Sequence, residues 1–174
     1  MDSPRTAVLA PAIRHANEAD LAAIVAIYNA AIPGRLATAD TTPVSVDDRR
    51  AWFATFDTAS RPIWVAETNG RIAGWLGLRS FYGRPAYHRT VEVAVYVAPE
   101  FQRQDIATSL MRHAADAAPA LGIATFLAFV FGHNDASLAL FRAAGFAHWG
   151  TLPRIAELDG VERDLMILGR RLTP

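Results

Sequence analysis

The sequence contains no cysteine and no lysine, so all 17 of its basic residues are arginines. The lack of cysteine excludes disulfides, thiol nucleophiles and cysteine-ligated metals. The lack of lysine excludes Schiff-base chemistry through a lysine amine and the phosphate-binding lysine of a P-loop. The five histidines form no i,i+4 or His-Glu-x-x-His pairing, so we expect no metal site.

Net charge and long apolar runs are also missing. The 17 acidic residues balance the 17 arginines, so no overall field attracts nucleic acid or an anionic membrane. Residues 1–5 contain no basic segment leading into an apolar one, and no uninterrupted apolar stretch approaches the ~18 residues of a membrane span. We therefore expect a cytoplasmic protein with neither a nucleic-acid nor a membrane partner. The absence of cysteine is compatible with a cytoplasmic location.

Length and patterning favour one domain with a sizeable core, since 52% of the 174 residues are hydrophobic. We expect a flexible tail over residues 1–11 and a single domain over residues 12–174. Strands are predicted at 12–16, 62–67, 71–78, 90–97, 125–131, 146–158 and 161–168, and helices at 17–32, 45–56, 106–121 and 137–144. This order predicts an α/β fold around one mixed sheet flanked by helices.

The segment 95–111 combines the end of a strand, a short polar turn and the start of a helix. Pro99 ends the strand, and apolar residues recur at helical spacing from Ile106 onwards. A turn that opens a helix exposes several backbone N–H groups, which makes it suitable for binding an anion. The same pattern also fits an ordinary helix start with Asp105 as the N-cap.

The hexapeptide Gln102–Ala107 resembles the Gln/Arg-x-x-Gly-x-Gly/Ala signature of the GNAT N-acetyltransferase superfamily, with Asp105 in place of the middle glycine. Further matching segments are Ile27–Ala31, Ala37–Pro43, Tyr87–Glu92 and Asn134–Ser137. Together they make the chain similar to the phosphinothricin and methionine sulfone/sulfoximine acetyltransferases within that superfamily. The resemblance covers roughly residues 12–170 and implies the GNAT (acyl-CoA N-acyltransferase) fold.

This resemblance implies direct transfer of an acetyl group from acetyl-CoA to the primary amine of a small amino-acid-like molecule, in a homodimer. An acyl-enzyme is not expected, because there is no cysteine and no serine in a recognisable nucleophile motif. Backbone amides of the turn would hold the pyrophosphate, and the Asn134 side chain would bind the pantetheine arm. The implied cosubstrate-binding residues are Val95, Tyr96, Val97, Gln102, Arg103, Gln104, Asp105, Ile106, Ala107, Thr108, Asn134, Ser137 and Phe141.

Two of these residues change what the resemblance implies. Asp105 would bring a carboxylate beside the pyrophosphate, which at ~4 Å costs roughly 1 kcal/mol in water and about 4 kcal/mol at intermediate dielectric. Acetyl-CoA is therefore expected to bind about one to three decades more weakly, with Arg103 offsetting part of the repulsion. Phe141 replaces a tyrosine that can protonate the departing thiolate in other GNAT enzymes, so water or the substrate ammonium would supply that proton.

Glu92 is a carboxylate in the middle of a predicted strand, between Val91 and Val93. One interpretation is a solvated or ion-paired residue on an exposed face of the sheet. The other is a general base that takes a proton from the substrate ammonium, directly or through a water molecule. The phosphinothricin acetyltransferases have a glutamate at the matching position, and this resemblance implies that Glu92 is the catalytic base.

The segment 79–88 is predicted to be a loop rich in arginine and aromatic residues. Guanidinium groups suit a carboxylate or phosphinate and aromatic rings suit a pocket wall, so we expect Tyr82, Arg84 and Tyr87 to bind the substrate. A surface loop with packed aromatics is the alternative. On the opposite wall relatives commonly have an aromatic residue where this chain has Ala39, so the acceptor pocket is expected to differ.

Two other functions remain open from the sequence. In the first, the chain is an acetyltransferase whose acceptor is another small amine or a peptide N-terminus. In the second, the chain is a GNAT-fold ligand-binding module in which Asp105 impairs the use of acetyl-CoA.

Overall fold

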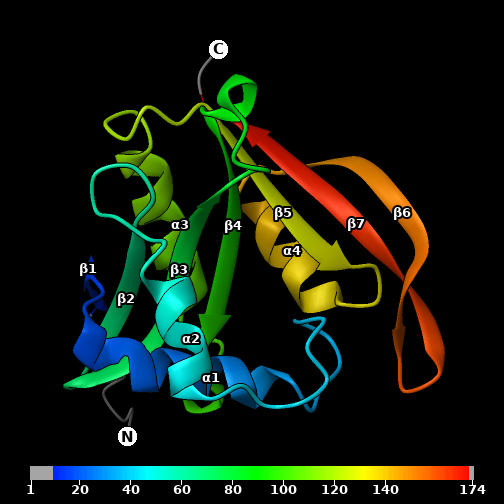
Figure 1. Ribbon diagram of the computed structural model, residues 1–174, viewed down its shortest axis with the longest axis horizontal. Helices are drawn as coiled ribbons and strands as arrows, with labels where there is room; N and C mark the ends of the chain where they lie inside the picture. The colour runs from blue at the N-terminus through cyan, green and yellow to red at the C-terminus, as the bar shows by residue number, and fades with distance from the viewer. Residues whose placement is uncertain (1–9, 173–174) are drawn as a thin grey trace, which may run out of the picture.

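A seven-stranded sheet in the order β1-β2-β3-β4-β5-β7-β6 forms the centre of the computed structural model, which describes residues 10–172 (Figure 1). Nearly all of the predicted tail, residues 1–9, lies outside the described part. The predicted order of strands and helices is confirmed. The elements are β1 (Ala12–His15), α1 (Leu21–Ala31), α2 (Val46–Phe53), β2 (Ile63–Thr68), β3 (Arg71–Ser80), β4 (Thr90–Val97), α3 (Ile106–Ala117), β5 (Thr125–Phe131), α4 (Asp135–Ala143), β6 (Ala147–Leu158) and β7 (Val161–Arg171).

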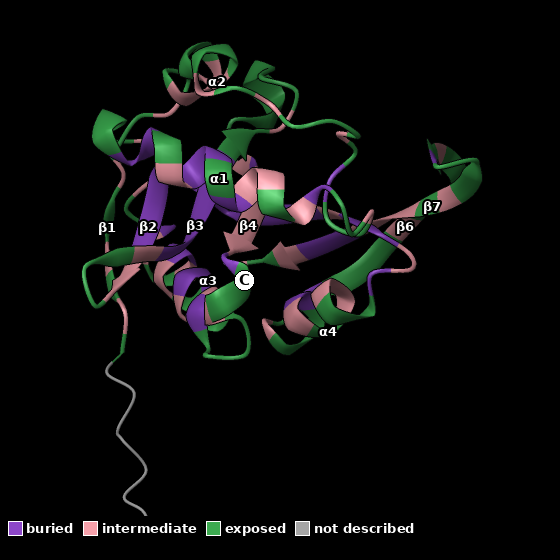
Figure 2. Cartoon of the chain, turned by 90° about the horizontal axis from the view of Figure 1, so that it is seen from below, coloured by how far each residue is buried: buried purple, intermediate pink, exposed green. Residues whose placement is uncertain are grey.

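Helices cover both faces of the sheet, with α1 and α2 on one face and α3 and α4 on the other (Figure 2). The alternation along β4 divides its side chains between these layers. Val91 and Val93 are buried in the core with α3, whereas Ala94 and Tyr96 pack against the cluster formed with α1 and α2. None of the helices within residues 10–172 is long and apolar enough to cross a membrane.

Several elements end at other residues than predicted. Helix α2 ends at Phe53 rather than at residue 56, and Phe56 follows in a turn. Helix α3 ends at Ala117, because Pro119 lacks the N–H that a further helical turn requires. Strand β3 continues through Ser80 because it pairs with β4 up to Ser80 opposite Val91. Residues 79 and 80, predicted as loop, are therefore strand residues.

The parallel pairing of β4 with β5 is short. It joins Thr90 to Thr125, Val91 to Phe126 and Glu92 to Leu127, and no pairing of the two strands follows. Beyond Glu92 the strands separate, while β5 keeps β7 as its partner through Phe131. The sheet therefore opens between β4 and β5 directly after Glu92.

Asp20 joins the first strand to the first helix. Asp20 is 6% exposed, and its carboxylate accepts hydrogen bonds from Arg14 at 2.7 and 2.9 Å and a third from the backbone N–H of Asn17 at 2.8 Å. The Asn17 side chain in turn accepts from the N–H of Ala19. The hydrogen bonds from Arg14 hold the pKa of Asp20 below its ordinary value of 3.8, despite the opposing effect of burial.

Replacing Asp20 with asparagine is expected to lower the free energy of unfolding by about 1.5–3 kcal/mol at pH 7, because charge-assisted hydrogen bonds are lost. A carboxyl group whose pKa is lower in the folded state than in the unfolded state stabilises the fold at pH values above its unfolded-state pKa. This stabilisation is lost as the pH falls from the unfolded-state pKa through the folded-state pKa. The difference between wild type and Asp20→Asn in urea denaturation should therefore shrink below about pH 3.8. Asp47→Asn, at an exposed ion pair, is the control and should change little. A difference that stays constant from pH 7 to 2.5 would contradict this assignment.

Candidate active site

Three adjoining hollows follow strand β4. The first hollow, about 290 Å³ in volume, lies between α1, α2 and the sheet. It is named the acceptor cavity because it contains Ala39, which the family resemblance places on a wall of the acceptor pocket. The central cavity occupies the opening between β4 and β5, and the outer groove runs along the turn before α3. Glu92 lines both the acceptor cavity and the central cavity, and Tyr96 lines all three hollows. The residues around the acceptor cavity are Ile24, Val25, Tyr28, Ala39, Val44, Arg49, Trp52, Phe56, Trp75, Gly77, Arg79, Glu92, Ala94 and Tyr96.

Aromatic rings form much of the acceptor cavity. Trp75 is buried and stacks on Tyr96 with 4.9 Å between ring centroids, and Trp52 meets Trp75 edge to face at 5.7 Å. Phe56 lies close to the strand because Gly77 has no side chain; a Cβ atom there would be 3.0 Å from the Phe56 ring. The cavity is therefore apolar at its base, with charged groups at particular points around it.

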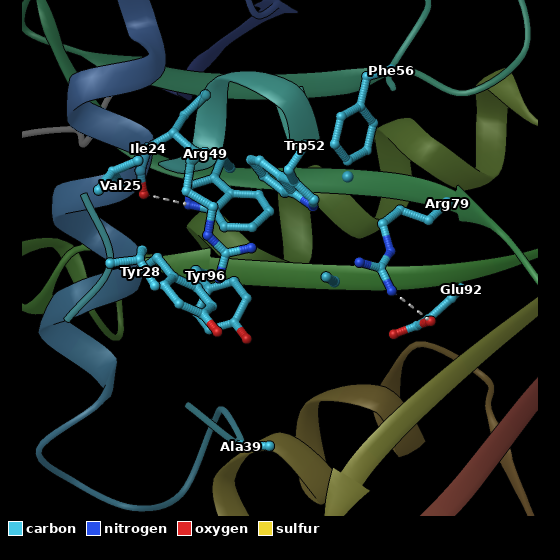
Figure 3. A pocket seen from close by; sticks show the side chains of 14 residues that line it. Ile24, Val25, Tyr28, Ala39, Arg49, Trp52, Phe56, Arg79, Glu92 and Tyr96 are labelled. Atoms are coloured by element: carbon cyan, nitrogen blue, oxygen red, sulfur yellow. Dashed lines mark hydrogen bonds and ion pairs between the residues drawn. The ribbon is translucent and has the colours of Figure 1, made fainter. Parts of the chain in front are cut away.

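Arg49 is one of those charged groups, and Figure 3 shows its side chain close to the rings of Tyr28 and Trp52. Its Nη2 donates to Asp40 Oδ2 at 2.9 Å, and its guanidinium lies over the rings of Tyr28 at 4.6 Å and Trp52 at 5.3 Å. The Tyr28 hydroxyl donates to the same Asp40 oxygen and contacts the hydroxyl of Thr38. Burial, reinforced by the hydrogen bond to Asp40, raises the pKa of Tyr28, so it remains a neutral phenol.

Glu92 lies beside Arg79, its register partner on β3 (Figure 3). Arg79 Nη2 donates to Glu92 Oε2 at 3.3 Å, and the Glu92 side chain is 30% exposed. The carboxylate is thus ion-paired, as one interpretation of the sequence expects. Glu92 also lines both the acceptor cavity and the central cavity.

The turn before α3 contains two residues in the left-handed conformation, Arg103 with φ 59° and Asp105 with φ 58°. Asp105 occupies the N-cap position of α3, but its side chain makes no capping hydrogen bond. Glycine suits this φ, and aspartate tolerates it better than most residues do. The predicted residues of the turn line the outer groove except Gln104, whose side-chain amide donates to the Glu100 carbonyl.

Asn134 joins the N-terminus of α4 to the loop after α1. It is 6% exposed; its Oδ1 accepts from the Ser137 N–H at 3.1 Å, and its Nδ2 donates to the Leu36 carbonyl at 3.0 Å. The Tyr96 hydroxyl donates to the neighbouring Ala37 carbonyl at 2.9 Å. Leu36 and Ala37 are thereby held where the central cavity meets the outer groove. Phe141 is buried and lines the central cavity.

Tyr82, Arg84 and Tyr87 lie elsewhere. Tyr82 is 79% exposed, and Phe81 packs against the rings of both Tyr82 and Tyr87. None of the three predicted substrate residues lines the hollows described above. The structure does not bring them together with Glu92.

Sequence reasoning missed Tyr28, Arg49, Trp52 and Trp75 as residues of the cavity. A signal was present for two of them, because Arg49 and Trp52 are three residues apart on a predicted helix and therefore share a face. Within the described part of the chain, no group of three or more histidine, aspartate or glutamate side chains could hold a metal ion.

Comparison with known proteins identifies the family. A model of the acetyltransferase (GNAT) family matches residues 22–146. The chain is 49% identical to "Putative phosphinothricin acetyltransferase YwnH" of Bacillus subtilis, over 92% of this chain and 99% of that protein. It is 31% identical to the L-methionine sulfoximine/L-methionine sulfone acetyltransferase of Pseudomonas aeruginosa, over 95% of this chain and 97% of that one.

A solved structure agrees with these sequence matches. The phosphinothricin acetyltransferase of Sinorhizobium meliloti, in complex with AcCoA, superposes with a TM-score of 0.88 at 29% identity, over 94% of this chain and 89% of that one. The chain therefore belongs to the GNAT acetyltransferase family and has its predicted fold. It is an acetyl-CoA-dependent N-acetyltransferase.

The double role of Asn134 can be separated by substitution. Asn134→Asp keeps the oxygen that caps α4 but replaces the donor to Leu36 with a second oxygen, so we expect residues 35–39 to exchange amide hydrogens about tenfold faster while α4 stays protected. Asn134→Ala removes both bonds and should expose both segments. Hydrogen exchange measured by mass spectrometry distinguishes the two patterns. Wild-type protection of residues 35–39 in Asn134→Asp would show that this hydrogen bond does not hold the loop.

Proposed function

We propose that the chain transfers the acetyl group of acetyl-CoA directly to the amine of a small amino-acid-like substrate, of the phosphinothricin or methionine sulfone/sulfoximine type, with Glu92 as general base. The observation that carries this proposal is the position of Glu92, at the border of the acceptor cavity and of the opening between β4 and β5. A thioester in that opening and an amine in the acceptor cavity would meet beside this carboxylate.

The arrangement of the three hollows supports a path along which acetyl-CoA would bind. The pyrophosphate would lie on the backbone amides at the start of α3, where free N–H groups and the helix dipole favour an anion. The pantetheine arm would continue past Asn134 and Ser137 into the opening of the sheet, where residues 93–97 of β4 are not paired with β5. Backbone polar groups there are available to pair with the pantetheine amides. In the structure of the Sinorhizobium meliloti relative, AcCoA is bound.

The reaction then needs one base and one proton donor. Glu92 takes a proton from the substrate ammonium, directly or through water, and the neutral amine attacks the thioester carbonyl carbon. As the tetrahedral intermediate collapses, the carbon–sulfur bond breaks and the thiolate of CoA leaves. Phe141 has no proton to give, so the thiolate takes its proton from water or from the substrate nitrogen, which is cationic after the neutral amine has attacked.

The position of Arg79 supports the proposal that the acceptor is an amino-acid-like molecule. Arg79 pairs with Glu92 through a single hydrogen bond of 3.3 Å, and both side chains line the acceptor cavity. A zwitterionic substrate can replace this pair, with its ammonium on Glu92 and its carboxylate on the guanidinium of Arg79. A simple amine would leave Arg79 unused.

We also propose that the chain acts as a homodimer. The β6–β7 hairpin exposes four large apolar side chains, Trp149, Leu152, Ile155 and Val161. Apolar side chains that gather on one exposed hairpin favour contact with another protein surface, and a second copy of this chain is the partner proposed here.

Glu92→Gln is expected to fold normally and to lower kcat about 10²-fold at pH 7, because the substrate amine is protonated and has lost its base. The deficit should shrink at higher pH, where the amine loses its proton to solvent. Steady-state kinetics from pH 6 to 9, followed by detection of the released CoA thiol, measure both effects. Unchanged kinetics across this range would remove Glu92 from the role of base.

Asp105→Asn is expected to tighten acetyl-CoA binding about tenfold, because it removes one negative charge beside the pyrophosphate. Asp105→Gly removes the same charge and also fits the φ of 58°, so it should bind at least as tightly. Calorimetric titration measures both, with Asp116→Asn farther along α3 as the control. Looser binding in both variants would disprove this account of the turn.

A further inference from the structure

We propose that Asp40 determines substrate specificity, by neutralising Arg49 so that the acceptor cavity selects amino acids with uncharged side chains. This inference rests on the proposed function and concerns the part of the substrate that does not react. It follows from a count of the charges around the cavity.

Among the described residues, 10–172, three that line the acceptor cavity are charged: Arg49, Arg79 and Glu92. The α-amine and α-carboxylate of the acceptor occupy Glu92 and Arg79. Within the described part of the chain, Arg49 is therefore the lining cation that remains for a charged group on the substrate side chain.

Arg49 already has an anionic partner. Its Nη2 is 2.9 Å from Asp40 Oδ2, and the exposed fractions of the two side chains are 21% and 43%. The guanidinium carbon also lies 4.6 Å from the centroid of the Tyr28 ring and 5.3 Å from that of Trp52, and these cation–π contacts favour its present position. Asp40 is fixed as well, since it accepts a hydrogen bond from the Tyr28 hydroxyl. The Arg49–Asp40 pair thus presents hydrogen-bond donors to the acceptor cavity but carries no net charge.

A side chain with neutral acceptor oxygens, such as the sulfone of methionine sulfone, can accept from the remaining N–H groups of Arg49 and pack on the aromatic wall. The methylphosphinate of phosphinothricin carries a full negative charge. It would lie near the Asp40 carboxylate with its attraction to Arg49 cancelled, and it would lose hydration on entering an aromatic cavity. The cavity should therefore discriminate between these two otherwise similar acceptors.

The test compares kcat/KM for L-methionine sulfone and L-phosphinothricin with acetyl-CoA as donor. We expect the wild type to favour the sulfone at least about tenfold. Asp40→Asn leaves Arg49 with an unbalanced charge and should shift the ratio about tenfold towards phosphinothricin. Arg49→Gln leaves Asp40 unbalanced and should shift the ratio the other way. Asp47→Asn, an exposed residue of the same helix as Arg49, is the matched control and should leave the ratio unchanged.

A wild type that prefers phosphinothricin, or an Asp40→Asn ratio equal to that of the wild type, would overturn the assignment. Thermal melting shows whether each variant is folded; if Asp40→Asn does not fold, the wild-type ratio and Arg49→Gln still decide. If the wild type binds acetyl-CoA but acetylates neither amino acid, the proposed function fails and the specificity proposal fails with it. A wrong ratio with both amino acids acetylated refutes the specificity proposal alone.

Discussion

The structure depends on a parallel strand pair that stops after three residue pairs. Pairing of β4 with β5 ends at Glu92 opposite Leu127, and each strand is held on its other edge, by β3 and β7 respectively. Because both strands are fixed from outside, the opening between them is a stable part of the fold. The opening also leaves backbone N–H and C=O groups in the middle of the sheet without a hydrogen-bond partner on a neighbouring strand. Such groups require another hydrogen-bond partner, because an unpaired buried backbone group is energetically costly.

The position of the charges follows from this opening. Glu92 is the last paired residue of β4, so its carboxylate lies where the sheet divides, and its register places Arg79 beside it. A second pair, Arg49 with Asp40, lies on the helical side of the acceptor cavity. Each guanidinium is therefore matched to a carboxylate, and an aromatic wall lies between the two pairs. Under the proposed function, a zwitterion would exchange its own charges for one of these pairs. An additional charge would then meet no unpaired counterpart among the residues within 10–172 that line the cavity.

The sequence was most informative where structure is local. The order of the elements follows from periodicity, and Ser45 caps α2 at its predicted start. Asn17 also caps at the predicted position, but it caps a short 3₁₀ helix, Glu18–Asp20, and α1 itself begins only at Leu21. Contacts between distant segments were harder to predict. Arg79 belongs to a strand only because β4 pairs with it, and Tyr28 and Arg49 meet only because α1 packs against α2. Tyr82 has the residue type of a pocket wall, but the backbone of its loop directs it to solvent.

The turn before α3 shows how a backbone conformation limits the residues that can replace one another. At the φ of 58° found for Asp105, glycine, asparagine and aspartate are the residues accommodated at least cost. In the genetic code an aspartate codon becomes an asparagine or a glycine codon by one base change. Under the proposed function, one such change would therefore alter the affinity of this turn for the pyrophosphate and leave the course of the main chain in place.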